Sequence, residues 1–291
     1  YFSYANTTGH GIIGKHNLSK HNLTFRETSV LLNSRLKLDG SMNLMRQVVK
    51  NKPTVGGFYM NPLVGLYRFP RGEDISYYKE NFEVYDEGRN LNIQNWHTSY
   101  EDFEQNPYWI TNRILSKENR MHVIVSLSAN LKINDWLSLQ TRGNVDYIND
   151  KVRQQFYAST APALAGANGR YIEMDYQETQ YYGDAILMMK KQWDAFSLNA
   201  ALGASINDKT VNSTRYDSKT ASLKYANVFN LANIIMNGSA GLDQKIDARR
   251  QLQSLFATAQ LGYNEFVYLD LSARNDWSST LAYTSHEKSG Y

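Results

Sequence analysis

The sequence predicts an all-β fold, and the architecture it favours is an antiparallel transmembrane β-barrel or part of one. Three observations support this: apolar and polar residues alternate over long runs, short turns alternate with long polar connections, and helical periodicity is nearly absent. The longest alternation covers residues 121–133. A soluble sandwich typically uses strands of about 5–6 residues, whereas about 9–11 residues of a tilted strand cross a bilayer. The long alternating runs therefore favour the membrane barrel.

The clearest strand pair lies between residues 121 and 147. Odd positions in 121–133 are apolar, and the even positions are polar except for Ile124. This period of two is that of a strand with one apolar and one polar face. After a turn at 134–136 the alternation resumes, so both strands place apolar side chains on the same face.

The same pattern recurs along the chain at irregular spacing. Further alternating runs cover residues 36–48, 196–207, 255–263 and 267–274. Short turns are expected near residues 33–34, 134–135, 192–194 and 264–265, whereas other connections are long and polar, above all residues 50–120. Short periplasmic turns and long extracellular loops are typical of an outer-membrane barrel. A helical turn or two is expected only within residues 100–114.

In a barrel the two faces of each strand have different surroundings. The apolar face would meet membrane lipid, and aromatic residues at the strand ends would form the interfacial girdle: Trp136, Tyr147, Tyr263 and Trp277. The polar face would line a wet lumen, with charged members Lys37, Asp39, Arg142, Asp146, Asp270 and Arg274.

The composition narrows the function classes. The chain has 291 residues with 31 basic and 28 acidic side chains, and its net charge of +3 argues against a nucleic-acid binder. The aromatic content of 13% is too high for a disordered chain. The absence of cysteine excludes disulfides, thiolate metal sites and cysteine nucleophiles.

Short motifs give no support for a cofactor, a metal site or catalysis. Residues 9–14 match GxGxxG, but they lack the buried strand before and the helix after that a dinucleotide site requires. His10, His16 and His21 are spaced by six and five residues, which suits neither a helix face nor a regular strand ligand set. GxSxG, HExxH and Walker motifs are absent. We therefore expect a protein that is not an enzyme and holds no metal or cofactor.

Aromatic residues in the longest connection are candidates for ligand contact. Five of them lie within fourteen residues, interleaved with amide and carboxylate side chains: Trp96, Tyr100, Phe103, Tyr108 and Trp109. Flat aromatic faces beside such groups suit the C–H faces and hydroxyl rims of sugar rings. Packing of the loop on itself is the alternative and the favoured explanation, because a connection of this length needs its own small core. The substrate-contact candidates are Trp96, Tyr100, Tyr108 and Trp109.

Five stretches of the chain, in order, carry a family resemblance. They are Asn61-Pro62-Leu63 with Phe69-Pro70-Arg71-Gly72; Asn106-Pro107-Tyr108-Trp109 with Asn112-Arg113; residues 131–137; residues 227–231 with Asn233; and residues 269–281, which read LDLSARNDWSSTL. Together they resemble SusC/RagA-like TonB-linked outer-membrane transporters. The resemblance covers nearly the whole chain, although each stretch by itself is mainly structural.

The resemblance implies both an architecture and a function. Residues 1–291 would be part of the barrel domain, roughly ten strands of a 22-stranded barrel, with the plug and the N-terminal extension absent from this sequence. The whole protein would import oligosaccharides, peptides or other large nutrients across the outer membrane of a Gram-negative, Bacteroidetes-type bacterium. Its partners would be a SusD-like surface lipoprotein and the TonB complex, which acts through the missing plug region. The resemblance assigns no ligand-binding residue.

Two other function classes remain open at this point. A soluble, exported β-sheet protein that binds glycans could have the same Tyr, Trp and Asn content, and it would be monodisperse without detergent. An outer-membrane barrel enzyme is the less favoured third class, and it would lose activity when one acid pair is changed.

Overall fold

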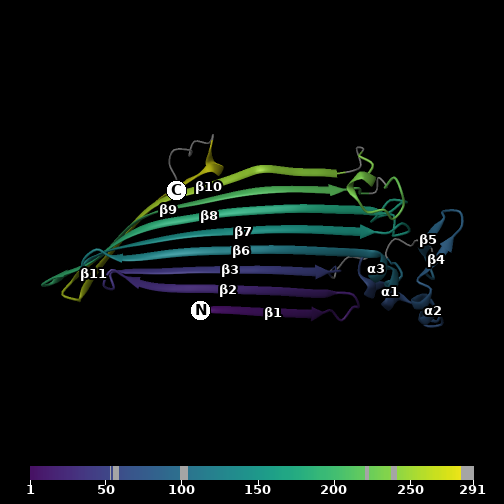
Figure 1. Ribbon diagram of the computed structural model, residues 1–291, viewed down its shortest axis with the longest axis horizontal. Coiled ribbons are helices and arrows are strands. Elements are labelled where there is room, and N and C mark those ends of the chain that lie inside the picture. The colour runs from purple at the N-terminus through teal and green to yellow at the C-terminus, as the bar shows by residue number, and fades with distance from the viewer. Residues whose placement is uncertain (53, 55–58, 99–103, 220–222, 237–240, 283–291) are drawn as a thin grey trace.

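One antiparallel sheet of nine strands makes up most of the structure (Figure 1). The computed structural model describes residues 1–52, 54, 59–98, 104–219, 223–236 and 241–282. In this part of the chain the strands lie side by side in sequence order: β1 (Phe2–His10), β2 (Asn17–Leu31), β3 (Leu36–Lys50), β6 (Ile114–Lys132), β7 (Leu137–Phe156), β8 (Arg170–Trp193), β9 (Phe196–Asp217), β10 (Gly241–Tyr263) and β11 (Val267–Ser278). The predicted all-β antiparallel architecture is confirmed, and most strands exceed the length needed to cross a bilayer.

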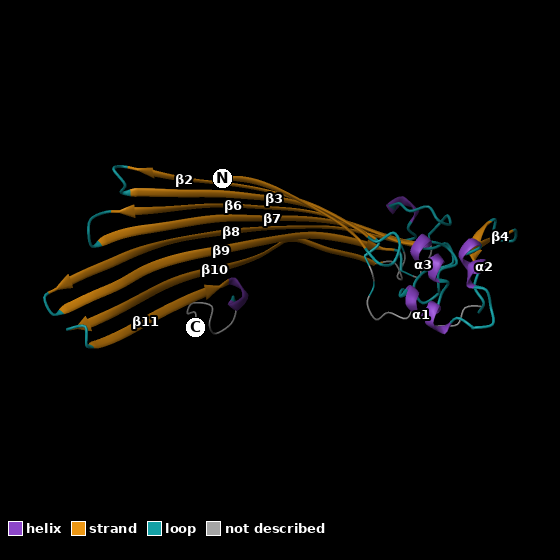
Figure 2. Cartoon of the chain, turned by 90° about the horizontal axis from the view of Figure 1, so that it is seen from below, coloured by secondary structure: helices purple, strands orange, loops and turns teal. Residues whose placement is uncertain are grey.

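The two ends of the sheet differ in their connections (Figure 2). At one, the turn end, short turns join β2–β3, β6–β7, β8–β9 and β10–β11, as predicted. At the other, the loop end, residues 51–113, 157–169 and 218–240 connect β3–β6, β7–β8 and β9–β10. The glycine-rich residues 9–14 form the end of β1 and the turn into β2, so no helix follows them.

The connection between β3 and β6 folds into a small unit at the loop end, which we call the cap. It contains α1 (Pro62–Arg68), α2 (Ile75–Glu80), the two-stranded sheet of β4 (Glu83–Asp86) and β5 (Leu91–Gln94), and α3 (Pro107–Arg113). Each helix begins after a side chain that accepts a hydrogen bond from the second backbone N–H beyond it: Asn61, Asp74 and Asn106. Among the described residues, no helix has both the length and the apolar character to span a bilayer.

The helix predicted within residues 100–114 corresponds to α3, but α1 and α2 were not predicted. For α1 the missed signal is Asn61-Pro62, the same capping residue and first-turn proline that precede α3. For α2 it is the capping residue Asp74.

Register divides the side chains of the sheet into two faces, because directly paired residues point the same way. The apolar face carries rows such as Leu36–Leu131–Leu139–Leu187–Leu202. Its side chains are open to the surroundings: Leu127 is 58% exposed, Leu202 48% and Leu271 54%. The opposite, polar face carries all six charged residues predicted for the lumen.

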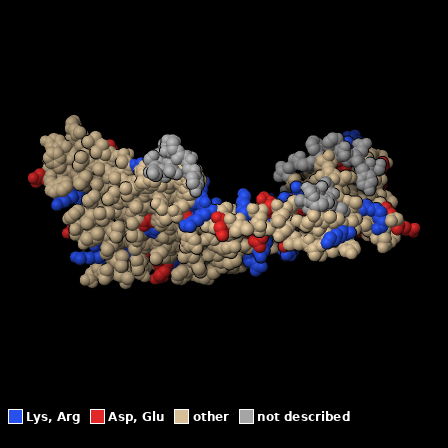
Figure 3. All heavy atoms as spheres, turned by 90° about the horizontal axis from the view of Figure 1, so that it is seen from above, with Lys and Arg blue, Asp and Glu red and all other residues tan. Residues whose placement is uncertain are grey.

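Burial is inverted relative to a soluble protein. The buried apolar side chains of the described residues lie at the loop end, among them Trp109, Ile110, Phe156 and Leu223, whereas large exposed apolar side chains cover the strands. Figure 3 shows mostly uncharged atoms over the turn-end part of the sheet and charged side chains gathered along the part that leads to the cap.

The loop-end edge of the apolar band stays on one register row over β1, β2 and β3 and lies nearer the turn end on β11, as strand tilt requires. On β3 the last apolar side chain before a polar one is Leu44, and on β11 it is Ala273, which register aligns with Leu36. This is a shift of eight residues over six strand steps, or about 26 Å along the strands against about 29 Å across them. Strands tilted by about 40° to a level band produce this shift, and a membrane barrel has tilts of about 35–45°.

Candidate functional site

The polar face is crossed by ion pairs between neighbouring strands. Arg142 on β7 donates to Asp184 on β8 from Nε, at 3.1 and 3.0 Å from the two carboxylate oxygens, and from a terminal nitrogen at 2.6 Å. The Tyr182 hydroxyl donates to the same carboxylate at 2.7 Å. The Asp184 side chain is only 1% exposed. Because a buried carboxylate is unfavourable without partners, this arrangement holds the charge by bidentate pairing.

Similar pairs occupy the polar face nearer the loop end. Lys209 Nζ lies 2.6 Å from Glu178, which also accepts from the Tyr176 hydroxyl. Arg120 donates to Asp150 at 2.7 and 2.6 Å.

At the N-terminal side of the sheet, Asp39 accepts from Arg26 at 3.0 and 2.9 Å and from Thr28 at 2.7 Å. The polar face is therefore a charged but largely neutralised surface. It can be wetted and can exchange hydrogen bonds with a passing solute. Within the described residues no group of acidic or histidine side chains has a geometry for holding a metal ion.

A buried polar network joins the cap to the connection between β7 and β8. Asn106 is fully buried and donates from its amide to the carbonyls of Tyr78 at 3.0 Å and Asn95 at 2.7 Å. The Gln105 side chain accepts from Ala161 N at 2.8 Å, and the backbone N of Gln94 donates to Ser159 Oγ at 2.9 Å. Because these bonds satisfy backbone groups of both connections, they hold the described parts of the two loops together.

An ion pair with aromatic neighbours fixes the base of the cap. Arg113 donates to Glu83 at 2.7 and 2.6 Å, and its guanidinium lies 5.4 Å from the Phe82 ring centre and 5.1 Å from that of Tyr157. Hydrogen bonding to Glu83 raises the pKa of Arg113, so its cationic form is favoured further.

The third long connection is anchored at the end of β9. Asp217, 2% exposed, accepts from Arg170 at 2.8 Å through each oxygen and from Arg215 at 2.7 Å. Burial by itself would raise the pKa of Asp217, but the hydrogen bonds from Arg170 and from the backbone N–H of Lys219 hold it below its ordinary value. Asn227, within a resemblance stretch, accepts from Ala158 N at 2.7 Å and so links this loop to its neighbour.

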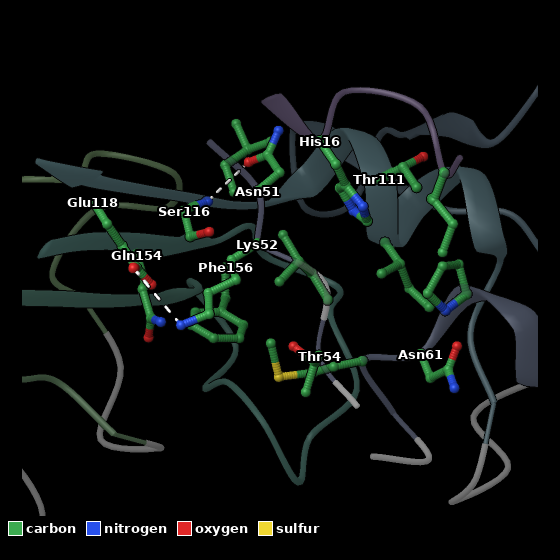
Figure 4. Close-up of a pocket in the computed structure, with 16 residues that line it drawn as sticks. His16, Asn51, Lys52, Thr54, Asn61, Thr111, Ser116, Glu118, Gln154 and Phe156 are labelled. Carbon is green, nitrogen blue, oxygen red and sulfur yellow. Dashed lines mark hydrogen bonds and ion pairs between the residues drawn. The ribbon is translucent and has the colours of Figure 1, made fainter. Parts of the chain in front are cut away.

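A cavity of about 320 Å³ lies between the cap and the loop-end part of the polar face (Figure 4). Ile13, Met60, Ile110, Ile114 and Phe156 supply apolar walls. The polar lining includes His16, Lys52, Glu118 and Gln154. Lys52 Nζ is 3.9 Å from Glu118, and burial lowers the pKa of His16, which favours the neutral imidazole. The cavity can accommodate a small apolar group flanked by hydrogen-bonding or charged groups.

Comparison with known proteins identifies the fold. No family model and no curated protein matches the sequence. Among solved structures, the RagAB peptide transporter matches with a TM-score of 0.68 and 17% identity over 94% of this chain and 29% of that chain. FpvA of P. aeruginosa, bound to a pyoverdine and iron, matches with a TM-score of 0.58 and 13% identity over 95% of this chain and 32% of that chain. The siderophore receptor PiuA from Acinetobacter baumannii matches with a TM-score of 0.52 and 12% identity over 95% of this chain and 38% of that chain.

The fold is that of part of an antiparallel β-barrel, as in the matched outer-membrane proteins. The resemblance of the sequence to the SusC/RagA type agrees with the match to RagAB, and at these identities the likeness is one of fold. The chain spans less than two fifths of each of the three matched chains. In such a barrel the turn end is periplasmic and the loop end extracellular.

Three of the four predicted ligand-contact residues are described, all of them in the cap, and their surroundings differ. Trp109 is 1% exposed and donates from Nε1 to Thr160 at 3.1 Å, so its contacts are those of packing. The half-buried Trp96 lies against Phe69 and Tyr78, with ring centres 5.3 Å away in both cases. Tyr108 is half-buried on α3, and Tyr100 lies outside the described residues, as does Phe103. Ligand contact by this group stays a prediction.

Trp96 also belongs to a buried polar cluster that sequence reasoning missed. Its Nε1 donates to Glu104 at 3.2 Å, and His97 Nε2 lies 3.0 Å from the same oxygen. Arg68 Nε is 3.2 Å from the other carboxylate oxygen, a charge contact without hydrogen-bond geometry. No local pattern indicated this cluster, because α1 and the β5–α3 connection meet only in the folded cap.

The tyrosine–carboxylate pairs of β8 were missed as well, although the sequence contains a signal for them. Each pair consists of residues two positions apart on the strand, so its side chains share a face: Tyr176 with Glu178, and Tyr182 with Asp184. A repeated Tyr-x-acid pattern in an alternating segment predicts such hydrogen bonds.

Proposed function

We propose that this chain is a barrel segment of a TonB-dependent importer of large nutrients in the outer membrane of a Bacteroidetes-type bacterium. One observation carries the proposal: a single tilted sheet exposes an apolar band on one face and a charge-paired, wettable surface on the other. The matched structures of a peptide transporter and siderophore receptors support the same class. The role is transport, without catalysis by this segment.

The exposed apolar band supports residence in a bilayer over the soluble alternative. Each large apolar side chain gains about 1.5–3 kcal/mol when it leaves water, and the band places many of them together. A soluble protein with this surface would associate through it. Because unpaired backbone groups are strongly disfavoured in lipid, the free edges of β1 and β11 in the described sheet require further strands to pair with them in the complete barrel.

A SusD-like lipoprotein is the proposed partner at the extracellular end. The cap and the neighbouring connection expose large tyrosines there: Tyr67 is 86% exposed, Tyr85 59% and Tyr225 71%. Tyrosine is enriched at protein interfaces because it combines a large contact area with a hydrogen-bonding hydroxyl. An oligosaccharide or peptide held between the two proteins would enter along the polar face, with TonB acting through a plug region.

The test begins with the complete natural polypeptide in its own cells. We expect it in the outer-membrane fraction, soluble only with detergent and co-purifying with a lipoprotein. Uptake of labelled oligosaccharides and peptides is then compared in wild-type cells, in cells lacking this protein, and in cells lacking TonB. Loss of uptake of the same solutes in both mutants supports the proposal. A protein that is monodisperse in plain buffer refutes it and favours the soluble glycan-binding alternative.

A further inference from the structure

A patch of basic side chains lies on the lipid-facing side of the sheet, between the apolar band and the loop end. Five exposed residues form it, and we call it the basic patch: Arg46 and Lys50 on β3, Lys117 on β6, and Lys151 and Arg153 on β7. Register places all five on the apolar face rather than in the lumen. Three adjacent strands therefore present cations to the surroundings at the extracellular edge of the band.

Only part of this positive charge is neutralised within the described chain. Arg153 pairs with Glu173 at 3.2 Å, and Lys151 with Asp175 at 3.4 Å. Arg46, Lys50 and Lys117 have no carboxylate partner among the described residues. Moreover, Lys50 and Lys117 are directly paired across β3 and β6, and Lys117 is directly paired with Arg153. Like charges opposite one another destabilise a sheet unless an anion lies between them.

The patch begins at the height of the headgroup layer of a membrane and extends outward from it. At a tilt of about 40°, each residue along a strand adds about 2.5 Å of height. Arg46 is two residues beyond Leu44, and Lys117 is four beyond Met121, the last apolar side chain on its strand. The backbones of Arg46 and Lys117 thus lie about 5 and about 10 Å beyond that edge. Those of Lys50 and Arg153, six residues beyond Leu44 and Tyr147, lie about 15 Å beyond it. Each polar layer of a bilayer is about 5–8 Å thick. Long basic side chains bend their charged ends toward this layer.

We infer that the basic patch binds phosphate-bearing headgroups of outer-leaflet lipid. Charge complementarity, exposure on the lipid-facing side and height above the band all point to this occupant. The bound anions would relieve the repulsion between Lys50, Lys117 and Arg153. They would also hold this side of the barrel at a defined depth, directly below the connection that carries the cap. This inference rests on the membrane location in the proposed function, but it assigns a site that transport does not require.

The experiment uses the complete protein, purified in detergent and stripped of lipid. It is mixed with equal amounts of phosphatidylglycerol and phosphatidylcholine, and the lipids retained are counted by native mass spectrometry. We expect preferential retention of phosphatidylglycerol by the wild type. In the variant K50Q/K117Q that preference should fall by about 25-fold, since each basic residue near a membrane surface contributes about fivefold to binding of anionic lipid.

The matched control is K37Q/K190Q, which removes the same charge from exposed positions on the polar face. It should leave the preference within about twofold of the wild type, because those side chains face the lumen. Equal retention of the two lipids by the wild type overturns the inference, as does an equal loss in both variants. A protein that needs no detergent would overturn the proposed function too, whereas a membrane protein without lipid preference would overturn only this inference.

Discussion

Replacing Asn106 by alanine should loosen the cap far more than the same change at Asn61. Both residues precede a proline and cap a seven-residue helix, so their sequence contexts match. Asn61 accepts one hydrogen bond, from Leu63 N at 3.0 Å, and is half-buried. The side chain of Asn106 is fully buried and makes three: it accepts from Tyr108 N at 2.8 Å and donates to two carbonyls of other segments.

The difference in stability loss between the two variants can be estimated from the hydrogen bonds that each one removes. Each net hydrogen bond contributes about 1 kcal/mol, so Asn106→Ala should cost about 3 kcal/mol, whereas loss of a helix cap alone costs about 1 kcal/mol. Hydrogen–deuterium exchange of the intact protein measures this locally, because exchange follows the opening equilibrium. The Ile110 amide, which bonds Asn106 O at 3.0 Å, should exchange roughly 100-fold faster in N106A. In N61A the Val64 amide should exchange only about fivefold faster than in the wild type.

Two results would contradict this reasoning. Equal acceleration in the two variants would mean that the bonds from Asn106 to Tyr78 and Asn95 contribute nothing beyond the cap. Unchanged exchange at Ile110 in N106A would mean that the cap is held by other contacts.

Three further predictions concern the sheet, the loop end and the ligand. Gly203→Ala should lower the midpoint of heat unfolding in detergent, because its new Cβ would lie 2.3 Å from the Phe256 ring; Gly143→Ala, with nothing within 4 Å, should leave the midpoint unchanged or raise it. Because its folded pKa is depressed, Asp217 should stabilise the loop end above pH 3.8, its ordinary value, with the contribution lost as the pH falls toward the folded value. Amide protection there should fall with acid in the wild type and much less in D217N, and an identical acid response would exclude this carboxylate as the cause. If Trp96 contacts ligand, Trp96→Ala should weaken ligand affinity in a titration of folded protein; unchanged affinity would leave packing as its role.

Local alternation of apolar and polar residues was enough to predict the architecture and the two faces of the sheet. Alternation between residues 121 and 147 identified a hairpin, its apolar side and its turn, and these are properties of neighbouring residues along one strand. The same locality explains why Arg142 and Asp270 could be assigned to the polar face. Helix starts were also encoded locally, and α1 was not predicted only because the Asn61-Pro62 signal was not used.

Which of these side chains meet depends on how the strands and loops are arranged in space. Alternation is unchanged when a strand slides by two residues, so it cannot select Asp184 as the partner of Arg142 or place Lys50 opposite Lys117. Register between strands makes that choice, and it depends on turns, loops and packing throughout the sheet. The same is true of Asn106, whose partners come from segments of the cap that no local pattern connects. The strand tilt and the height of the basic patch above the apolar band likewise exist only once all nine strands are aligned.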